Sequence, residues 1–139
     1  MKPCRTWSQF TEYFWSHVDK NGPLPTHQPE LGPCWLWMRE RSRNGYGGTY
    51  TPSGRLSAHR AAWLLANGSL PDGKHVLHRC DVRACVRPDH LYAGSGVDNS
   101  RDMHERGRFH SGQRSKPHCP NGHAYSGENT KWYQGRRYC

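Results

Sequence analysis

The chain opens with an apolar pattern that predicts an amphipathic helix between Thr6 and Asp19. Apolar side chains recur there at i, i+3, i+7 and i+11, which places them on one face of a helix. These residues are Trp7, Phe10, Phe14 and Val18. Thr6 is followed three residues later by Gln9, and the pair resembles a capping box at the helix start. We expect this helix to pack against the rest of the protein.

The pattern then changes to short apolar runs separated by turn residues. Residues 21–33 hold four of the ten prolines, so this segment is predicted to be a loop. The aromatic run Cys34-Trp35-Leu36-Trp37 predicts a short buried strand. The runs 45–50 and 55–58 flank Thr51-Pro52-Ser53-Gly54, whose proline and glycine predict the turn of a β-hairpin.

The second half of the chain predicts a helix, two strands and another helix. Residues 58–67 carry an apolar face of alanines and leucines and are followed by a glycine, which is a typical helix stop. Segments 73–78 and 91–93 are predicted as strands, and 97–106 as a helix that again ends before a glycine. The order between 73 and 107 is therefore strand, loop, strand, helix.

This pattern divides the chain into three segments. Residues 1–33 form an N-terminal helix and loop, 34–109 form the core, and 110–139 form a polar linker and a C-terminal tail. The length of 139 residues suits one domain with an appendage. Only 33% of the residues are hydrophobic, so a large and purely apolar core is excluded. Small domains of this kind are usually held together by disulfides, metals or partners.

The charge balance indicates the class of partner. Lys and Arg number 20 and Asp and Glu number 11, which gives a net charge of +9. This excess favours a polyanionic partner, and a basic protein without such a partner is the alternative. The longest apolar run, 61–66, is far shorter than the roughly 20 residues of a membrane helix. Because the N-terminus also lacks a signal-peptide pattern, we expect a cytoplasmic protein and no membrane.

Cysteine and histidine spacing predicts a metal site. In a reducing compartment, six cysteines and ten histidines favour zinc over disulfides. Cys80, Cys85 and His90 follow one another at intervals of five, which a tight loop can place around one tetrahedral ion. Cys34 is the natural fourth ligand, and it would join the early strand to this loop. Unpaired buried thiols are the alternative.

Other positions leave more than one role open. His78, two residues before Cys80, can be a further ligand, a packed core histidine or a base. In the tail, Cys119, His123 and Cys139 form a second Cys/His spacing. They supply three ligands for a second zinc, and a fourth would come from His118, from Cys4 or from no residue of the chain.

Arginines interleave with these elements. Arg39, Arg41 and Arg43 alternate before the predicted hairpin and can lie in a DNA groove. A solvated edge that resists strand pairing is the alternative for these three residues. The arginines that we expect to bind nucleic acid are Arg39, Arg41, Arg43, Arg55, Arg101 and Arg108.

An ordered set of motifs between Cys34 and Arg108 resembles a known family. The motifs are Cys34-Trp35-Leu36-Trp37, Gly45-Tyr46-Gly47, Ala58-His59-Arg60, Val76-Leu77-His78, Cys80-Asp81, Cys85, Pro88-Asp89-His90-Leu91, Asp98-Asn99 and Arg106-Gly107-Arg108. Together they resemble the HNH endonucleases of phages and mobile elements, within the ββα-metal (His-Me finger) superfamily. The order of the histidines, cysteines and asparagine is similar to that of the His-Cys box homing endonucleases.

The resemblance implies an α+β fold, with a small zinc-stapled ββα-metal nuclease core, an added β-hairpin and an N-terminal helix. It implies that His78 is the general base and Asn99 a Mg²⁺ (or Mn²⁺) ligand, and we expect Arg60 or His59 to steady the phosphate. The structural Zn²⁺ ligands that it implies are Cys34, Cys80, Cys85 and His90. This sequence departs from the family at Arg87, where Asn is frequent, and at Leu77, where an acidic residue or histidine is frequent. Asn99 is then left as the single metal ligand, with Asp98 or Asp102 as alternative contributors.

These features favour a metal-dependent endonuclease that hydrolyses phosphodiester bonds of double-stranded DNA, by nicking or by cutting both strands. A non-catalytic zinc-stabilised DNA-binding module is the alternative, and a secreted disulfide-bonded protein is a weaker third reading. For a phage-encoded protein, the compartment would be the host cytoplasm and phage packaging proteins are candidate partners.

Overall fold

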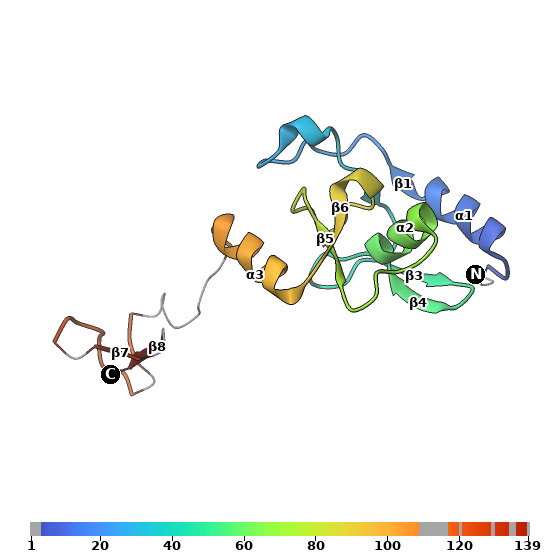
Figure 1. The fold of residues 1–139 in the computed structure, drawn as a ribbon. Helices are drawn as coiled ribbons and strands as arrows, with labels where there is room; N and C mark the ends of the chain where they lie inside the picture. Colours follow the sequence, from blue (N-terminus) through green and yellow to red (C-terminus); the bar gives the residue numbers. More distant parts are fainter. Residues whose placement is uncertain (1–3, 109–116, 120, 129, 134–135, 139) are drawn as a thin grey trace. The chain divides into compact units, whose positions relative to one another are not determined.

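The computed structural model describes residues 4–108, 117–119, 121–128, 130–133 and 136–138. The chain divides into two compact units, 1–99 and 100–139. Figure 1 shows the helices and strands along the chain. Among the described residues, no helix combines the length and the apolar character needed to cross a membrane.

Helix α1 (Trp7–Ser16) begins where its capping residues predict. The Thr6 hydroxyl accepts a hydrogen bond from the Gln9 backbone N–H at 3.2 Å, while the Gln9 side chain accepts one from the Arg5 N–H. Phe10 and Phe14 are the buried residues of the helix. The helix ends before the predicted Asp19, because the chain there turns into a short strand that pairs with a later segment.

The strands form small antiparallel pairs. The pairs are β1 (Val18–Asp19) with β2 (Leu36–Trp37), β3 (Gly48–Thr51) with β4 (Gly54–Ser57), β5 (His75–His78) with β6 (Leu91–Gly94), and β7 (Lys131–Tyr133) with β8 (Arg136–Tyr138). Two 3₁₀ turns, η1 (Pro29–Leu31) and η2 (Pro88–His90), lie in the connecting loops. The predicted α+β class and the hairpin around 51–54 are confirmed.

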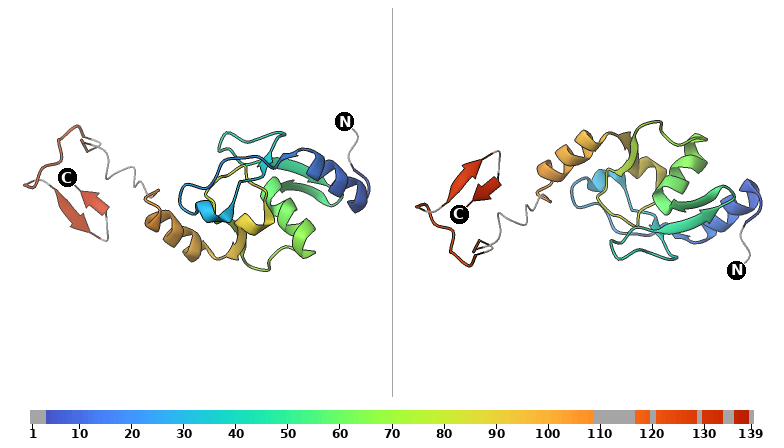
Figure 2. Two further views of the ribbon diagram at one scale, coloured as in Figure 1. Left: turned by 90° about the horizontal axis from the view of Figure 1, so that it is seen from above. Right: turned by 90° about the horizontal axis from the view of Figure 1, so that it is seen from below.

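Helix α2 (Ala58–Asn67) follows the β3–β4 hairpin directly and has the predicted bounds. Its C-cap is Gly68, whose left-handed backbone (φ 81°) allows its N–H to bond the Leu64 carbonyl. The helix lies beside the hairpin and contacts β5 as well (Figures 1 and 2). It therefore joins the hairpin to the strand that carries His78.

The chain passes from β5 through β6 into α3 (Gly96–Glu105), in the strand, strand, helix order predicted for a ββα unit. The start of α3 is capped reciprocally. The Ser95 hydroxyl accepts from the Asp98 N–H at 3.1 Å, and the Asp98 carboxylate accepts from the Ser95 N–H at 2.8 Å.

The apolar core of the first unit is small. Phe14 stacks on Trp37 with ring centroids 4.8 Å apart, and this contact joins α1 to β2. The buried residues of this cluster are Phe10, Phe14, Trp37, Ala58, Ala61, Ala62, Val76, Val86 and Leu91. A second buried cluster contains three cysteines rather than aliphatic side chains. The low hydrophobic content is thus reflected in a core that is part apolar and part thiol.

Gly47 lies between the start of α2 and the core residue Trp37. Its carbonyl accepts the Ala58 N–H at 2.8 Å. A Cβ atom at Gly47 would overlap Cδ1 of the Trp37 ring and lie 2.8 Å from the Ala58 Cβ. Both neighbours are fully packed, so neither has room to move aside.

We therefore predict that Gly47→Ala lowers the free energy of unfolding by about 1–3 kcal/mol, the usual effect of overpacking a core. Chemical denaturation followed by circular dichroism measures this change. Gly96→Ala is the matched control, because a Cβ there meets nothing within 4 Å. Equal stability of the two variants would contradict the proposed close packing of α2.

Candidate functional site

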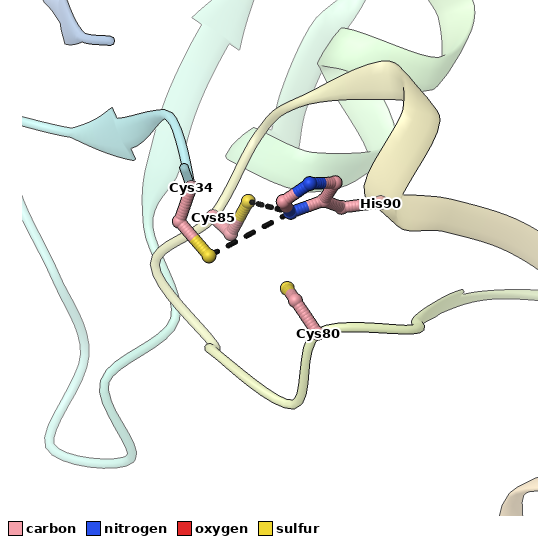
Figure 3. A group of neighbouring side chains, drawn as sticks. All are labelled: Cys34, Cys80, Cys85 and His90. Carbon is pink, nitrogen blue, oxygen red and sulfur yellow. Dashed lines mark hydrogen bonds between the residues drawn. The ribbon is translucent and has the colours of Figure 1, made fainter. Parts of the chain in front are cut away.

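Four side chains that are remote in sequence converge in the first unit. Cys34, Cys80, Cys85 and His90 are buried, and their donor atoms lie within 4.8 Å of one another. Figure 3 shows the three sulfur atoms and the imidazole turned toward a common space. Among the described residues this is the group that could hold a metal ion, and it contains the four ligands predicted from the sequence.

Backbone pairing places Cys85 beside Cys34. The Val86 N–H donates to the Trp35 carbonyl at 2.8 Å, and the Trp37 N–H donates to the Ala84 carbonyl at 2.9 Å. The loop that carries the other ligands turns sharply at Asp81, whose φ of 61° is unusual for a residue other than glycine. The loop that carries Cys80, Cys85 and His90 is thus held against β2 by hydrogen bonds.

The donor set has the dimensions of a tetrahedral site. Nδ1 of His90 lies 3.6 Å from Sγ of Cys34 and 3.5 Å from Sγ of Cys85. A zinc ion bound at about 2.3 Å from sulfur and about 2.0 Å from nitrogen separates its ligands by roughly 3.5–3.8 Å. Nε2 of His90 donates to the Leu31 carbonyl at 3.0 Å, so Nδ1 carries the lone pair that faces the sulfurs.

Three neighbouring thiols cannot all ionise without a cation, because the three negative charges would repel one another. Burial raises the pKa of Cys34 to about 11. The pKa of Cys80 is raised because its thiol hydrogen-bonds to Cys85, and the same bond lowers the pKa of Cys85 to about 5. One thiolate is therefore favoured at the expense of the others. A divalent cation would stabilise all three thiolates, so the residues present fit a metal ion.

His78 ends β5 next to this centre. Its Nε2 lies 2.9 Å from the Cys85 carbonyl oxygen. A carbonyl oxygen only accepts, so Nε2 carries the hydrogen and Nδ1 carries the lone pair. Burial lowers the pKa of His78, which favours the neutral imidazole. The loop that carries Cys80 and Cys85 thus also fixes the tautomer of the predicted base.

Two further rings contact His78. The His59 ring from α2 lies 4.8 Å away, and the Tyr46 ring lies 6.1 Å away, measured between centroids. Sequence reasoning considered His59 only as a phosphate contact and gave Tyr46 no role beyond a motif position. Only the Gly45-Tyr46-Gly47 and Ala58-His59-Arg60 motifs pointed to these positions, and neither motif predicts a ring contact.

A hollow of about 580 Å³ lies between the loop before β3, the β3–β4 hairpin and the start of α2. Its lining residues are Glu40, Arg41, Ser42, Tyr46, Gly47, Gly48, Arg55, Leu56, Ser57 and Arg60. Three of the predicted arginines, Arg41, Arg55 and Arg60, are thus brought together. Arg41 is held by two hydrogen bonds to the Trp37 carbonyl, at 2.7 and 3.0 Å.

The other predicted arginines are placed differently. Arg39 and Arg43 are exposed and are not among the described residues that line the hollow. Arg101 and Arg108 belong to the second unit.

The predicted magnesium ligand, Asn99, is exposed in the first turn of α3. The alternative contributors have other interactions. The Asp98 carboxylate accepts hydrogen bonds from both the backbone and the hydroxyl of Ser95, and it caps the helix. Asp102 lies 3.7 Å from Arg106.

The tail contains a tight turn around the predicted second Cys/His group. The Cys119 N–H donates to the His123 carbonyl at 2.9 Å, and Cys119 is buried. Cys139, the third predicted ligand, lies outside the described residues.

Comparisons with known proteins find matches that include this part of the chain. A family model described as HNH endonuclease matches residues 57–101. Protein 2.8 of Escherichia phage T7 is 36% identical over 83 residues, which are 58% of this chain and 56% of that protein. Protein 7.7 of the same phage is 32% identical over 80 residues, covering 58% of this chain and 62% of that protein. The matches thus span between 56% and 62% of these relatives.

No solved structure matches the chain. The matched segment contains α2, His78, three of the four metal-type ligands and Asn99, in the order that carried the resemblance in the sequence. Residues 57–101 are therefore similar to HNH endonucleases, and the matching relatives are phage proteins, in agreement with the resemblance seen in the sequence.

Proposed function

We propose that the protein is a metal-dependent endonuclease that hydrolyses phosphodiester bonds in double-stranded DNA, with His78 as the general base. The observation that supports this proposal is the hydrogen bond between His78 and the Cys85 carbonyl. The Nε2–H of His78 is engaged by this carbonyl, so Nδ1 is the ring atom able to accept a proton. A neutral imidazole in a fixed orientation is the form that a general base requires.

The reaction uses water as the nucleophile. Nδ1 of His78 removes a proton from the water molecule while the water oxygen bonds to phosphorus. The bond from phosphorus to the 3′ oxygen breaks, and the leaving oxygen takes up a proton from solvent. Because charge builds up on the phosphate, cationic side chains nearby are expected to accelerate this step.

Asn99 is the residue that would hold the catalytic metal, magnesium or manganese. Its amide oxygen is an acceptable ligand for a hard cation, and its position in the first turn of α3 leaves it exposed. When bound, such an ion supplies charge stabilisation for the phosphate and the leaving oxygen. One neutral protein ligand binds weakly, so phosphate and water would complete the coordination.

The arginines of the hollow would hold the DNA backbone. Arg60, Arg41 and Arg55 line it together with Tyr46, whose ring contacts that of His78. A guanidinium matches a phosphate in both charge and geometry. We assign Arg60 to the phosphate at the reaction site, and the other arginines predicted from the sequence to neighbouring phosphates.

We assign zinc to the Cys34, Cys80, Cys85 and His90 cluster, in a structural role. Four protein ligands close the coordination sphere and leave no position for substrate. Cys119, His123 and Cys139 remain candidates for a second zinc in the tail.

The test of the proposed function is incubation of supercoiled plasmid with the full chain, in Mg²⁺ or in EDTA. Conversion to nicked or linear DNA in Mg²⁺ alone supports it, and the product distinguishes nicking from double-strand cleavage. Tight DNA binding with no cleavage under any divalent cation favours the alternative, a non-catalytic zinc-stabilised DNA-binding module.

We predict that His78→Ala slows cleavage by roughly 10²–10⁴-fold, because a general base is lost. DNA affinity, measured by fluorescence anisotropy in EDTA, is expected to stay close to that of the wild type, since the arginines are retained. A cleavage rate within threefold of the wild type would exclude His78 as the base.

We predict that Cys85→Ser removes one bound zinc and unfolds the first unit, because zinc binding energy is also folding energy. Elemental analysis and thermal melting by circular dichroism measure the two effects together. Cys4→Ser is the matched control, because Cys4 lies outside the cluster and is partly exposed. A cooperative, wild-type melting transition in Cys85→Ser would refute the structural zinc.

We predict that Arg60→Ala weakens DNA binding and reduces the salt dependence of affinity. Each phosphate contact contributes about 0.9 to the slope of log affinity against log salt concentration, so the slope should become shallower by about 1. Arg5→Ala serves as the control, because Arg5 is exposed and does not line the hollow. An unchanged slope in Arg60→Ala would remove this residue from the phosphate site.

A further inference from the structure

Three aromatic side chains from separate elements form a compact group around the base. Tyr46 precedes β3, His59 lies in the first turn of α2, and His78 ends β5. Their ring centroids are 4.8 Å apart for the two histidines, 5.5 Å for Tyr46 and His59, and 6.1 Å for Tyr46 and His78. His59 is only 9% exposed, so it is enclosed next to the catalytic ring.

The two imidazoles are anchored in the same way. His78 donates its Nε2–H to the carbonyl of Cys85. His59 hydrogen-bonds to the backbone of Val76, and its Nδ1 is buried with no hydrogen-bond partner among the described residues. The bond to Val76 therefore uses Nε2 of His59. Two adjacent rings thus each carry a lone pair on Nδ1.

An unsatisfied buried acceptor needs a physical explanation. Leaving one unpaired costs roughly 1–3 kcal/mol, and native proteins rarely do so. Protonation does not relieve it at neutral pH, because burial, together with the neighbouring His78 and Arg60, lowers the pKa of His59 to about 3. The acceptor at His59 therefore requires a hydrogen donor that is not part of the described chain.

We propose that His59 is a second catalytic residue, whose Nδ1 accepts one hydrogen of the attacking water while Nδ1 of His78 accepts the other. This inference rests on the proposed nuclease function and extends it. A water molecule has two O–H donors, which match two neighbouring nitrogen acceptors. With both hydrogens engaged, a lone pair of the water oxygen is left to attack phosphorus.

The proton balance follows from this arrangement. The hydrogen bonded to His78 is transferred to that ring as the oxygen bonds to phosphorus and the bond to the 3′ oxygen breaks. The hydrogen bonded to His59 stays on the new phosphate oxygen, so His59 does not change its protonation state. Tyr46 packs on both rings and is 37% exposed, so the group of three rings borders on solvent at Tyr46.

Two amide substitutions separate the roles of the two ring nitrogens. The amide oxygen of asparagine is as many bonds from the backbone as Nδ1 of histidine, so His59→Asn keeps an acceptor at that position. The amide nitrogen of glutamine corresponds to Nε2, so His59→Gln keeps a donor for the Val76 carbonyl and lacks the Nδ1 acceptor. His59→Phe lacks both but fills a similar volume.

The experiment measures single-turnover cleavage of supercoiled plasmid in Mg²⁺, plasmid affinity in EDTA and the melting temperature. We expect His59→Phe and His59→Gln to cleave about 10²-fold more slowly, because the water is no longer oriented. His59→Asn should restore the rate to within about tenfold of the wild type. Affinity should not change, and His59→Gln, which keeps the donor to the Val76 carbonyl, should melt close to the wild type.

His75→Gln is the matched control, since His75 is exposed at the opposite end of β5 and should cleave at the wild-type rate. A wild-type rate in His59→Phe would overturn the proposal. Rescue by glutamine rather than asparagine would also overturn it, in favour of the Val76 bond. Slow cleavage accompanied by lower melting temperatures in all three variants would show a structural role instead. If the wild-type protein does not cut DNA, the nuclease function itself is refuted. The rates of the variants relative to the wild type test only the role of His59.

Discussion

The hydrogen bonds between residues 84–86 and 35–37 are the constraint on which the site depends. They hold Cys85 beside Cys34 and thereby bring the three cysteines and His90 together from segments that are far apart in the chain. Cys85 then contributes two groups, its thiol to the cluster and its carbonyl to His78. Any change that displaces this residue therefore affects both the cysteine and histidine cluster and the orientation of the His78 ring.

A bound metal would stabilise a chain that has few hydrophobic residues. The aliphatic and aromatic core is small, and the loop that carries the cysteines has few apolar side chains to bury. Closing the long loop between Cys34 and Cys80 opposes folding through lost chain entropy. Four strong ligand bonds can offset that loss, whereas burial of three thiols without a cation leaves them competing for a single negative charge.

Local features were predictable from the sequence, and long-range ones were predictable only where chemistry required them. The cap at Thr6, the bounds of α2 and the hairpin depend on neighbouring residues, so their patterns are visible in the chain. The remote ligand Cys34 was predictable because a tetrahedral site requires a fourth donor. The β1–β2 pair was not, because two residues per strand leave no periodic signal.

The contacts among the rings of Tyr46, His59 and His78, and the capping role of Asp98, were not predicted from the sequence. Ring contacts between Tyr46, His59 and His78 arise from the packing of three separate elements, and no spacing in the sequence encodes them. Asp98 follows Ser95 at the interval of a capping box. The resemblance to metal nucleases implies a metal-binding role for this carboxylate, whereas in the structure it caps the start of α3.

The first turn of α2 connects the binding and hydrolytic parts of the proposed mechanism. Consecutive helical residues point about 100° apart, so His59 can face the ring group while Arg60 faces the arginine-lined hollow. The position of this turn is set by Ala58, which is buried against Gly47 and bonded to its carbonyl. Gly47 therefore helps to fix the positions of His59 and Arg60. In the proposed mechanism, displacement of α2 by even 1 Å would alter the distance between the phosphate held by Arg60 and the water held by His59.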